Sequence, residues 1–153
     1  VFWSQGAHAP TTSHPESSSG IPAAATEATI DYVHGGDTVF LADRTKVRLL
    51  GINTPEIGDN RECYGEEATA ALRALLPVGS HVWVLADVEE LDQYGRSLLF
   101  IYTDDGTNVN LELLEIGAAE VEQYSPNFLF SDQLHSAEDA ARAADLGLWG
   151  VCR

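Results

Sequence analysis

The chain of 153 residues is long enough for one domain with a single hydrophobic core, and 44% of its residues are apolar. No apolar run approaches the roughly 18 residues of a membrane span, so we expect no membrane segment. Eight basic residues stand against 24 acidic ones, and the formal net charge of −16 argues against a protein that binds nucleic acid through a broad basic surface. A local cluster of arginines with a metal ion, or high salt that screens distant charges, would still permit such a partner.

Residues 1 to about 27 predict a flexible N-terminal tail, since the segment is rich in Ser, Thr and Pro and has few side chains to bury. The chain begins at Val1 and contains no methionine. We therefore expect that its first residue is not a translation start, either because a signal segment has been removed or because the chain was trimmed. A single domain is expected over residues 28–153.

Five short strands and three helices are predicted in this domain. The strands cover residues 29–33, 38–42, 46–52, 82–86 and 97–103, and the helices cover residues 66–76, 108–116 and 131–144. Gly35 and Gly36 supply the turn between the first two strands, and Ser131 is the expected N-cap of the third helix. A helix placed after the third of five strands favours a small closed barrel over a parallel sheet, in a mainly β fold of the α+β class.

Two cysteines, Cys63 and Cys152, lie far apart in the sequence. In a secreted protein such a pair predicts one disulfide, here between a central loop and the C-terminus. Two unrelated thiols are the alternative. Loop-closure entropy makes a bond over this separation worth roughly 4–5 kcal/mol, and strain often lowers that figure.

Three segments carry more polar and charged residues than strand packing requires. They are Gly36-Asp37-Thr38-Val39, the run from Val47 to Glu56, and Asp92-Gln93-Tyr94-Gly95-Arg96. Arg48 alternates with apolar neighbours, so we expect it inside the barrel or at its rim, where a guanidinium needs an anion. A phosphate and a carboxylate in a structural ion pair are both compatible with this position. Taken alone, Asp37 is typical of a turn cap and Arg96 of a solvated loop.

Together the three segments supply the parts for cleaving a phosphodiester bond. Oxygen donors from Asp37, Asn53 and the Thr54 carbonyl suit Ca²⁺. Glu56 can position or deprotonate a water molecule. The two arginines of these segments can neutralise the charge that builds on the oxygens of a five-coordinate phosphorus.

At this point a family resemblance is clear. Four segments resemble the staphylococcal nuclease (thermonuclease) family in order and spacing, and the similarity runs from about residue 28 to the closing Gly147-Leu148-Trp149. The segments are Gly36-Asp37-Thr38-Val39, the run from Arg48 to Glu56, Tyr64-Gly65-Glu66-Glu67-Ala68 and Tyr94-Gly95-Arg96. The resemblance implies a five-stranded OB-fold barrel with three helices. It also implies Ca²⁺-dependent hydrolysis of DNA and RNA that leaves 3′-phosphate ends.

The resemblance assigns roles position by position. Arg48 and Arg96 match the two phosphate-binding arginines of the family, and Glu56 matches the glutamate assigned to water activation. Asp37 matches a metal ligand, and Thr54 matches the residue that binds the metal through its carbonyl. The predicted catalytic and metal-binding residues are therefore those that the residue types alone already favoured.

The substrate side shows both agreement and departures. Tyr124 matches one of two tyrosines that pack around the nucleotide, and we also expect Tyr94 in the substrate site. Asn53 stands where the best-studied members have a metal-binding aspartate, so weaker Ca²⁺ binding is expected. Gly35 replaces another acidic residue near the metal. Glu122 replaces the second tyrosine, which removes a stacking surface and adds repulsion.

Two other classes of function are compatible with parts of the sequence. One is a non-catalytic module of the same fold that binds nucleic acid or protein, but such modules typically lack the arginines and acidic residues present here. The other is a barrel that binds an oligosaccharide or a protein through exposed aromatic residues, for which Phe40, Trp83 and Tyr102 are the candidates. We expect a secreted nuclease with no obligate protein partner. The single lysine, Lys46, among many acidic residues also suggests a halophilic host.

Overall fold

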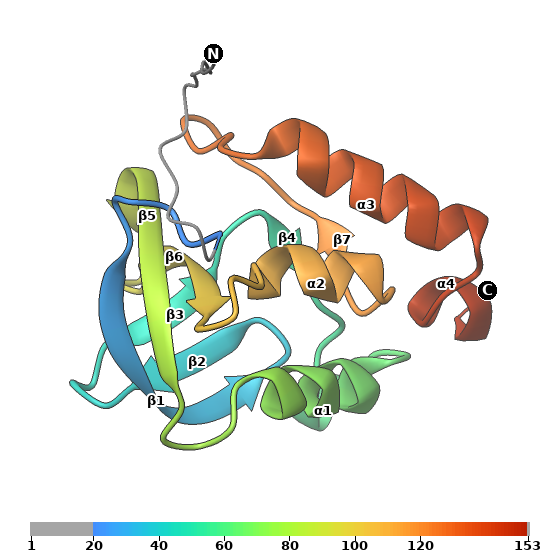
Figure 1. Ribbon diagram of the computed structural model, residues 1–153. Coiled ribbons are helices and arrows are strands. Elements are labelled where there is room, and N and C mark those ends of the chain that lie inside the picture. The colour runs from blue at the N-terminus through green and yellow to red at the C-terminus, as the bar shows by residue number, and fades with distance from the viewer. Residues whose placement is uncertain (1–19, 153) are drawn as a thin grey trace, which may run out of the picture.

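The computed structural model describes residues 20–152, in which five strands close into a barrel (Figure 1). The barrel strands are β1 (Thr26–Gly35), β2 (Thr38–Leu41), β3 (Lys46–Leu49), β6 (Ser97–Thr103) and β5 (His81–Leu91), in that spatial order. Neighbouring strands are antiparallel except β3 and β6, which are parallel. A separate two-stranded sheet joins β4 (Ile52–Asn53) to β7 (Glu120–Val121). The predicted five-stranded OB-fold barrel is confirmed.

The helices lie together on one side of the barrel (Figure 1). The three predicted helices are present as α1 (Gly65–Leu75), α2 (Val109–Glu115) and α3 (Ser131–Ala143). A 3₁₀ turn, η1 (Gly58–Asn60), and a short helix, α4 (Leu148–Val151), complete the fold. Helix α2 contacts β6, α1 and α3, so it joins the barrel to the other helices. No helix within residues 20–152 is long and apolar enough to span a bilayer.

Strand β3 and the segment after it are held in place by contacts with the core. Val47 and Leu49 are fully buried, and because side chains alternate along a strand, Arg48 between them points to the other side. Asn110 on α2 is also fully buried, and its amide nitrogen donates to the carbonyls of Leu50 and Leu99. The chain just after β3 is therefore fixed against a helix.

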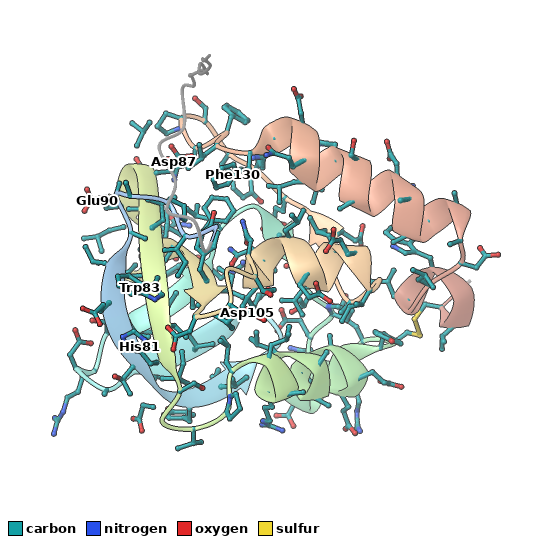
Figure 2. The ribbon with its side chains drawn as sticks, viewed as in Figure 1. His81, Trp83, Asp87, Glu90, Asp105 and Phe130 are labelled. Atoms are coloured by element: carbon teal, nitrogen blue, oxygen red, sulfur yellow. A yellow bond between two sulfur atoms is a disulfide. The ribbon has the colours of Figure 1, made fainter. Side chains whose placement is uncertain are left out.

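Strand β5 is longer than its sequence predicts, running to Leu91 rather than to residue 86. The extension carries acidic residues that are typical of a loop, but the segment before α3 holds it in place (Figure 2). Asp87 Oδ2 accepts from the Leu129 N–H at 2.9 Å, and the Glu89 N–H donates to Asn127 Oδ1 at 2.8 Å. Tertiary hydrogen bonds, rather than local preference, set the end of this strand.

Two further expectations differ from the structure in detail. Ordered structure begins before residue 28, because Ile21 is buried in the core and β1 starts at Thr26. Residues 1–19 of the predicted tail lie outside the described residues. Ser131 is not the N-cap of α3: Phe130 occupies that position with φ 63°, and the Ser131 hydroxyl donates to Gln123 Oε1 at 2.9 Å.

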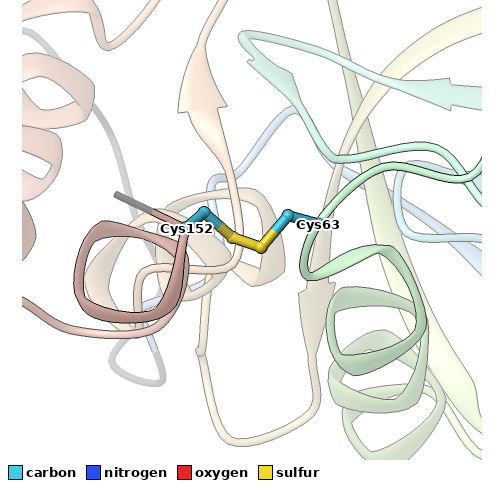
Figure 3. Close-up of a disulfide and its surroundings, with 2 residues drawn as sticks. All are labelled: Cys63 and Cys152. Atoms are coloured by element: carbon cyan, nitrogen blue, oxygen red, sulfur yellow. A yellow bond between two sulfur atoms is a disulfide. The ribbon is translucent and has the colours of Figure 1, made fainter.

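A disulfide joins Cys63 to Cys152, as the sequence predicts (Figure 3). The two Cα atoms are 5.9 Å apart, and the cysteines are 89 positions apart in the chain. Cys63 lies in the loop between η1 and α1, and Cys152 directly follows α4. The bond therefore ties the loop after Glu56 to the C-terminal end of the described chain.

Candidate active site

Asp37 lies in the two-residue turn between β1 and β2, with its side chain only 12% exposed. Its Oδ2 accepts from the Thr54 backbone N–H at 3.1 Å, and its Oδ1 accepts from the Thr38 hydroxyl at 3.2 Å. The turn approaches Thr54 this closely because Gly36 has no side chain; a Cβ there would overlap the Thr54 hydroxyl. Segments far apart in the sequence are thus brought together by the backbone itself.

Arg48 stands at the centre of the site, with its side chain 14% exposed and its terminal nitrogens surrounded by protein acceptors. These acceptors are the carbonyl oxygens of Leu49 and Ile52, both at 2.8 Å, and the side-chain oxygens of Asp37, Asn53 and Glu122, at 3.3, 3.4 and 3.2 Å. Two of these acceptors, Asp37 and Glu122, are carboxylates that form ion pairs with Arg48. The contact with Glu122 spans 74 positions of the chain.

Arg96 is held in place by the turn that begins at Asp92. Asp92 Oδ1 accepts from the backbone N–H groups of Tyr94 and Arg96 at 2.9 Å, and its Oδ2 accepts from Arg96 Nε at 2.7 Å. Burial raises the pKa of Asp92, but the hydrogen bonds from Arg96 and Tyr94 outweigh it and leave this pKa below its ordinary value. Within residues 20–152, Asp92 is the only ion-pair partner of Arg96. The two terminal nitrogens of Arg96 are therefore available to an anion.

Glu56 lies in the loop between β4 and α1, with an exposed side chain. Its main chain is fixed, because its N–H donates to Glu62 Oε1 at 2.8 Å and its carbonyl accepts from the Glu62 N–H at 3.0 Å. Gly65 opens α1 against this loop, and a Cβ there would overlap the Glu56 carbonyl oxygen. The start of α1 and the nearby disulfide thus set where Glu56 emerges.

Two neighbouring pockets share Arg48 and Arg96 as lining residues. One has a volume of about 350 Å³, and its other walls include Asp37, Asn53, Thr54 and Glu56; we call it the polar pocket. The other has a volume of about 540 Å³, and its other walls include Tyr94, Glu122 and Tyr124; we call it the aromatic pocket. Tyr94 and Tyr124 are 74% and 70% exposed, so they stand at its open rim. The structure brings every predicted site residue to one pocket or the other.

Residues 46–151 match the family model described as "Staphylococcal nuclease homologue". The chain belongs to the staphylococcal nuclease family. The matched segment contains both arginines and Glu56, whereas Asp37 precedes it. The segments that resemble the family in sequence also supply the residues that line the two pockets.

Named relatives point the same way. The chain is 31% identical over 143 residues to "Endonuclease YhcR" and 32% identical over 128 residues to "Endonuclease YncB", both of Bacillus subtilis (strain 168). These matches cover 80% and 79% of the chain, but only 11% and 60% of the two relatives. It is also 35% identical over 118 residues to an "Uncharacterized endonuclease" of Escherichia coli O157:H7, with 74% of the chain and 71% of that protein covered.

The polar pocket is lined by residues of the kinds that bind Ca²⁺, namely the carboxylate Asp37, the amide Asn53 and Thr54. Within residues 20–152 no group of three or more His, Cys, Asp and Glu side chains is arranged to hold a metal. Asp37 Oδ2 and Asn53 Oδ1 lie 3.3 and 3.4 Å from Arg48 Nη2, so both oxygens face this guanidinium in the structure. Thr54 lines the same pocket, and its N–H donates to Asp37 Oδ2. Ca²⁺ accepts carboxylate, amide and carbonyl oxygens together, and a single carboxylate predicts weak binding.

Sequence reasoning missed two features of this site. The sequence marks Asp92 only as part of a polar segment, although this residue orders the whole turn that presents Arg96. It marks Glu122 as a replacement of a tyrosine, and not as a partner of Arg48. The only signal for either was an acidic residue close to a predicted site residue, and in a chain with 24 acidic residues that signal carries little information.

Proposed function

We propose that the protein is a calcium-dependent nuclease that hydrolyses phosphodiester bonds in DNA and RNA. The observation that carries the proposal is that Arg48 and Arg96 line both an oxygen-rich pocket and an aromatic pocket. A scissile phosphate between the two pockets would meet both guanidiniums, while its nucleoside would lie on the aromatic side. The printed names of the relatives, which are endonucleases, support the same reaction class.

The arginines bind the phosphate and stabilise the charge that develops on it. Guanidinium groups match phosphate oxygens bidentately, and donors aimed at the reacting oxygens are worth about 10²–10³-fold in rate. Arg96 offers its terminal nitrogens directly. Arg48 must first exchange its contact with Glu122 for the substrate.

Calcium would be held by Asp37, Asn53 and the Thr54 carbonyl, where it would polarise the phosphate and offset its negative charge. Glu56, on the wall of the same pocket, orients a water molecule and accepts its proton as the oxygen attacks phosphorus. The bond to the 5′-oxygen breaks, this oxygen takes a proton from solvent, and the product keeps a 3′-phosphate. Tyr94 and Tyr124 pack against the nucleoside at the rim of the aromatic pocket.

We also propose that the protein is secreted and works in high salt. A disulfide persists in oxidising compartments outside the cytoplasm. A net charge of −16 would repel a polyanion at low ionic strength, and at 1 M salt the Debye length of about 3 Å removes that distant repulsion. Contacts of the substrate with Arg48 and Arg96 would then supply nearly all of the electrostatic part of binding.

Digestion of end-labelled single-stranded DNA with Ca²⁺ or with EDTA, at low and at molar salt, tests this function. We expect cleavage with Ca²⁺ only, more of it at high salt, and products whose terminal phosphate is removed by a 3′-phosphatase. Glu56→Gln, which keeps the shape of the side chain, is the matched control and should be strongly impaired. If folded protein binds DNA but cuts it under no condition, the chain is a non-catalytic binding module.

A further inference from the structure

A row of three side chains crosses the outer face of the barrel on β1, β2 and β3. Tyr32 pairs with Phe40, and Phe40 pairs with Lys46, in the strand register. The two rings are stacked, with centroids 4.7 Å apart and planes 11° apart, and Lys46 Nζ lies 5.6 Å from the Phe40 centroid. His34 meets Phe40 edge-on at 6.1 Å. We call Tyr32, His34, Phe40 and Lys46 the outer platform.

Cross-strand aromatic pairs stabilise sheets, but that role does not account for the exposure of this one. Tyr32 is 43% exposed. Strand β5 pairs with β1 only over Thr26–Thr29, so within residues 20–152 no strand pairs with β1 beside Tyr32 on the side away from Phe40. Because 43% of Tyr32 is exposed, part of its ring is open to solvent and can contact another planar group.

The outer platform is continuous with the polar pocket. His34 and Lys46 belong to the platform and also line that pocket. Lys46, the single lysine in a chain of net charge −16, is the cation that the platform and the pocket share. A polyanion that leaves the pocket in this direction would meet a cation first and exposed aromatic rings next.

We propose that the outer platform is a second nucleic-acid subsite, which binds the single-stranded part of the substrate that extends beyond the polar pocket. The inference rests on the proposed function, because it assumes that the nucleic acid occupies the polar pocket and extends from there to the platform. A base stacks on Tyr32, and Lys46 contacts a backbone phosphate. The strand is single because bases must be unstacked from their neighbours to lie on a protein ring. The substrate is thereby gripped at a position distant from the scissile bond.

Binding of two cleavage-resistant probes, measured by fluorescence anisotropy with Ca²⁺, tests the subsite. One probe is a phosphorothioate thymidine 12-mer, and the other is a 12-mer of the same backbone without bases. Tyr32→Leu keeps apolar contact with Phe40 and should weaken binding of the thymidine 12-mer about tenfold, within the range for one stacked base, without affecting the abasic probe. Phe128→Leu is the matched control, since Phe128 is 53% exposed and lines neither pocket.

Lys46→Gln should weaken binding of both probes and lower the slope of log affinity against log salt by about 0.7, as expected for one lost phosphate contact on a single strand. Arg73→Gln on α1, which removes the same charge elsewhere, should leave that slope unchanged. Equal effects of Tyr32→Leu on the two probes, or none, would overturn the platform, as would wild-type protein that binds neither. Binding of both probes as expected, by a protein that cuts no nucleic acid, would instead overturn only the proposed function.

Discussion

Arg48 and Arg96 line the same two pockets, yet the protein surrounds them differently. Arg48 emerges from a barrel strand, is 14% exposed, and has acceptors from the backbone and from three side chains around it. Arg96 ends a turn and is 25% exposed; its Nε donates to Asp92, and its guanidinium carbon lies 5.5 Å from the centroid of the Tyr94 ring. Arg48 is therefore fixed within the protein by its own contacts, whereas the terminal nitrogens of Arg96 face the pockets.

The difference shows how an acidic chain can keep a site for an anion. Asp37, Asn53 and Glu122 satisfy Arg48 without substrate, so a partly buried charge is not left uncompensated. Under the proposed function, a phosphate that binds Arg48 would replace a protein ligand, whereas a phosphate that binds Arg96 would add a ligand. We expect substitutions on the two sides to differ in their effects on stability and on substrate affinity.

The largest effect is expected from removing each guanidinium. Arg48→Ala and Arg96→Ala should each lower kcat on single-stranded DNA about 10²–10³-fold, because each removes a donor to the developing phosphate charge. Only Arg48→Ala should also lower the melting temperature clearly, since it removes the ion pair with Asp37 and the hydrogen bonds to the Leu49 and Ile52 carbonyls. Steady-state kinetics and thermal melts by circular dichroism measure both. Near-normal turnover in either variant would remove the phosphate role of that arginine.

A smaller effect is expected on calcium binding, which the proposed function assigns to Asp37, Asn53 and the Thr54 carbonyl. Asn53→Asp adds a carboxylate beside Asp37 and should tighten Ca²⁺ binding roughly tenfold in a calorimetric titration. Asn60→Asp in η1 is the matched control, because it adds the same charge outside both pockets. An unchanged titration for Asn53→Asp would argue that Asn53 is not a ligand.

Glu122→Gln should leave a terminal nitrogen of Arg48 available to an anion, as the terminal nitrogens of Arg96 already are. Removing the carboxylate frees Nη2 and takes a negative charge from the aromatic pocket, so KM for single-stranded DNA should fall about threefold, in line with the modest energy of a half-exposed ion pair. Glu120→Gln in β7 removes an equal charge at a residue that lines neither of the two pockets. An identical fall in KM for both variants would point to net charge and not to the contact with Arg48.

The smallest effect is a pH dependence of stability that lies outside the site. The ring nitrogens of His81 are each 2.7 Å from a carboxylate oxygen, one of Asp104 and one of Glu27, and these hydrogen bonds raise the pKa of His81, with Asp104 contributing most. The stabilisation is full below a pH of about 6.5, the ordinary pKa of histidine, and is lost as pH rises through the raised value.

Melting temperatures at a pH of about 6 and about 9 should therefore differ more for wild type than for His81→Gln. The arginines keep their charge over this range, so they contribute nothing to the difference. If the difference in melting temperature between the two pH values were the same in His81→Gln as in wild type, another titrating group would be its source.

Much of the fold was predictable from local patterns. The alternation of Val47, Arg48 and Leu49 predicts both a strand and an arginine on its non-core side, and the paired cysteines predict the disulfide. The residues proposed for the site stand out in the sequence because they cluster in short segments with oxygen donors and arginines, and the structure places them around two adjoining pockets.

The features that sequence did not predict depend on contacts between distant segments. The end of β5 is set by hydrogen bonds to Leu129 and Asn127. The stacking of Tyr32 on Phe40 depends on a register shift between Ile30 and Tyr32, where β1 has an extra residue. Neither the shift nor the contact of Glu122 with Arg48 has a local signature, because each arises only when the barrel closes.

A crystal structure of the Glu56→Gln variant with Ca²⁺ and a thymidine octanucleotide would test the central claim most directly. We predict one phosphate in hydrogen-bonding contact with both Arg48 and Arg96, Ca²⁺ bound by Asp37 and Asn53, and Glu122 displaced from Arg48. A phosphate bound away from both arginines, with the contact between Arg48 and Glu122 intact, would contradict it.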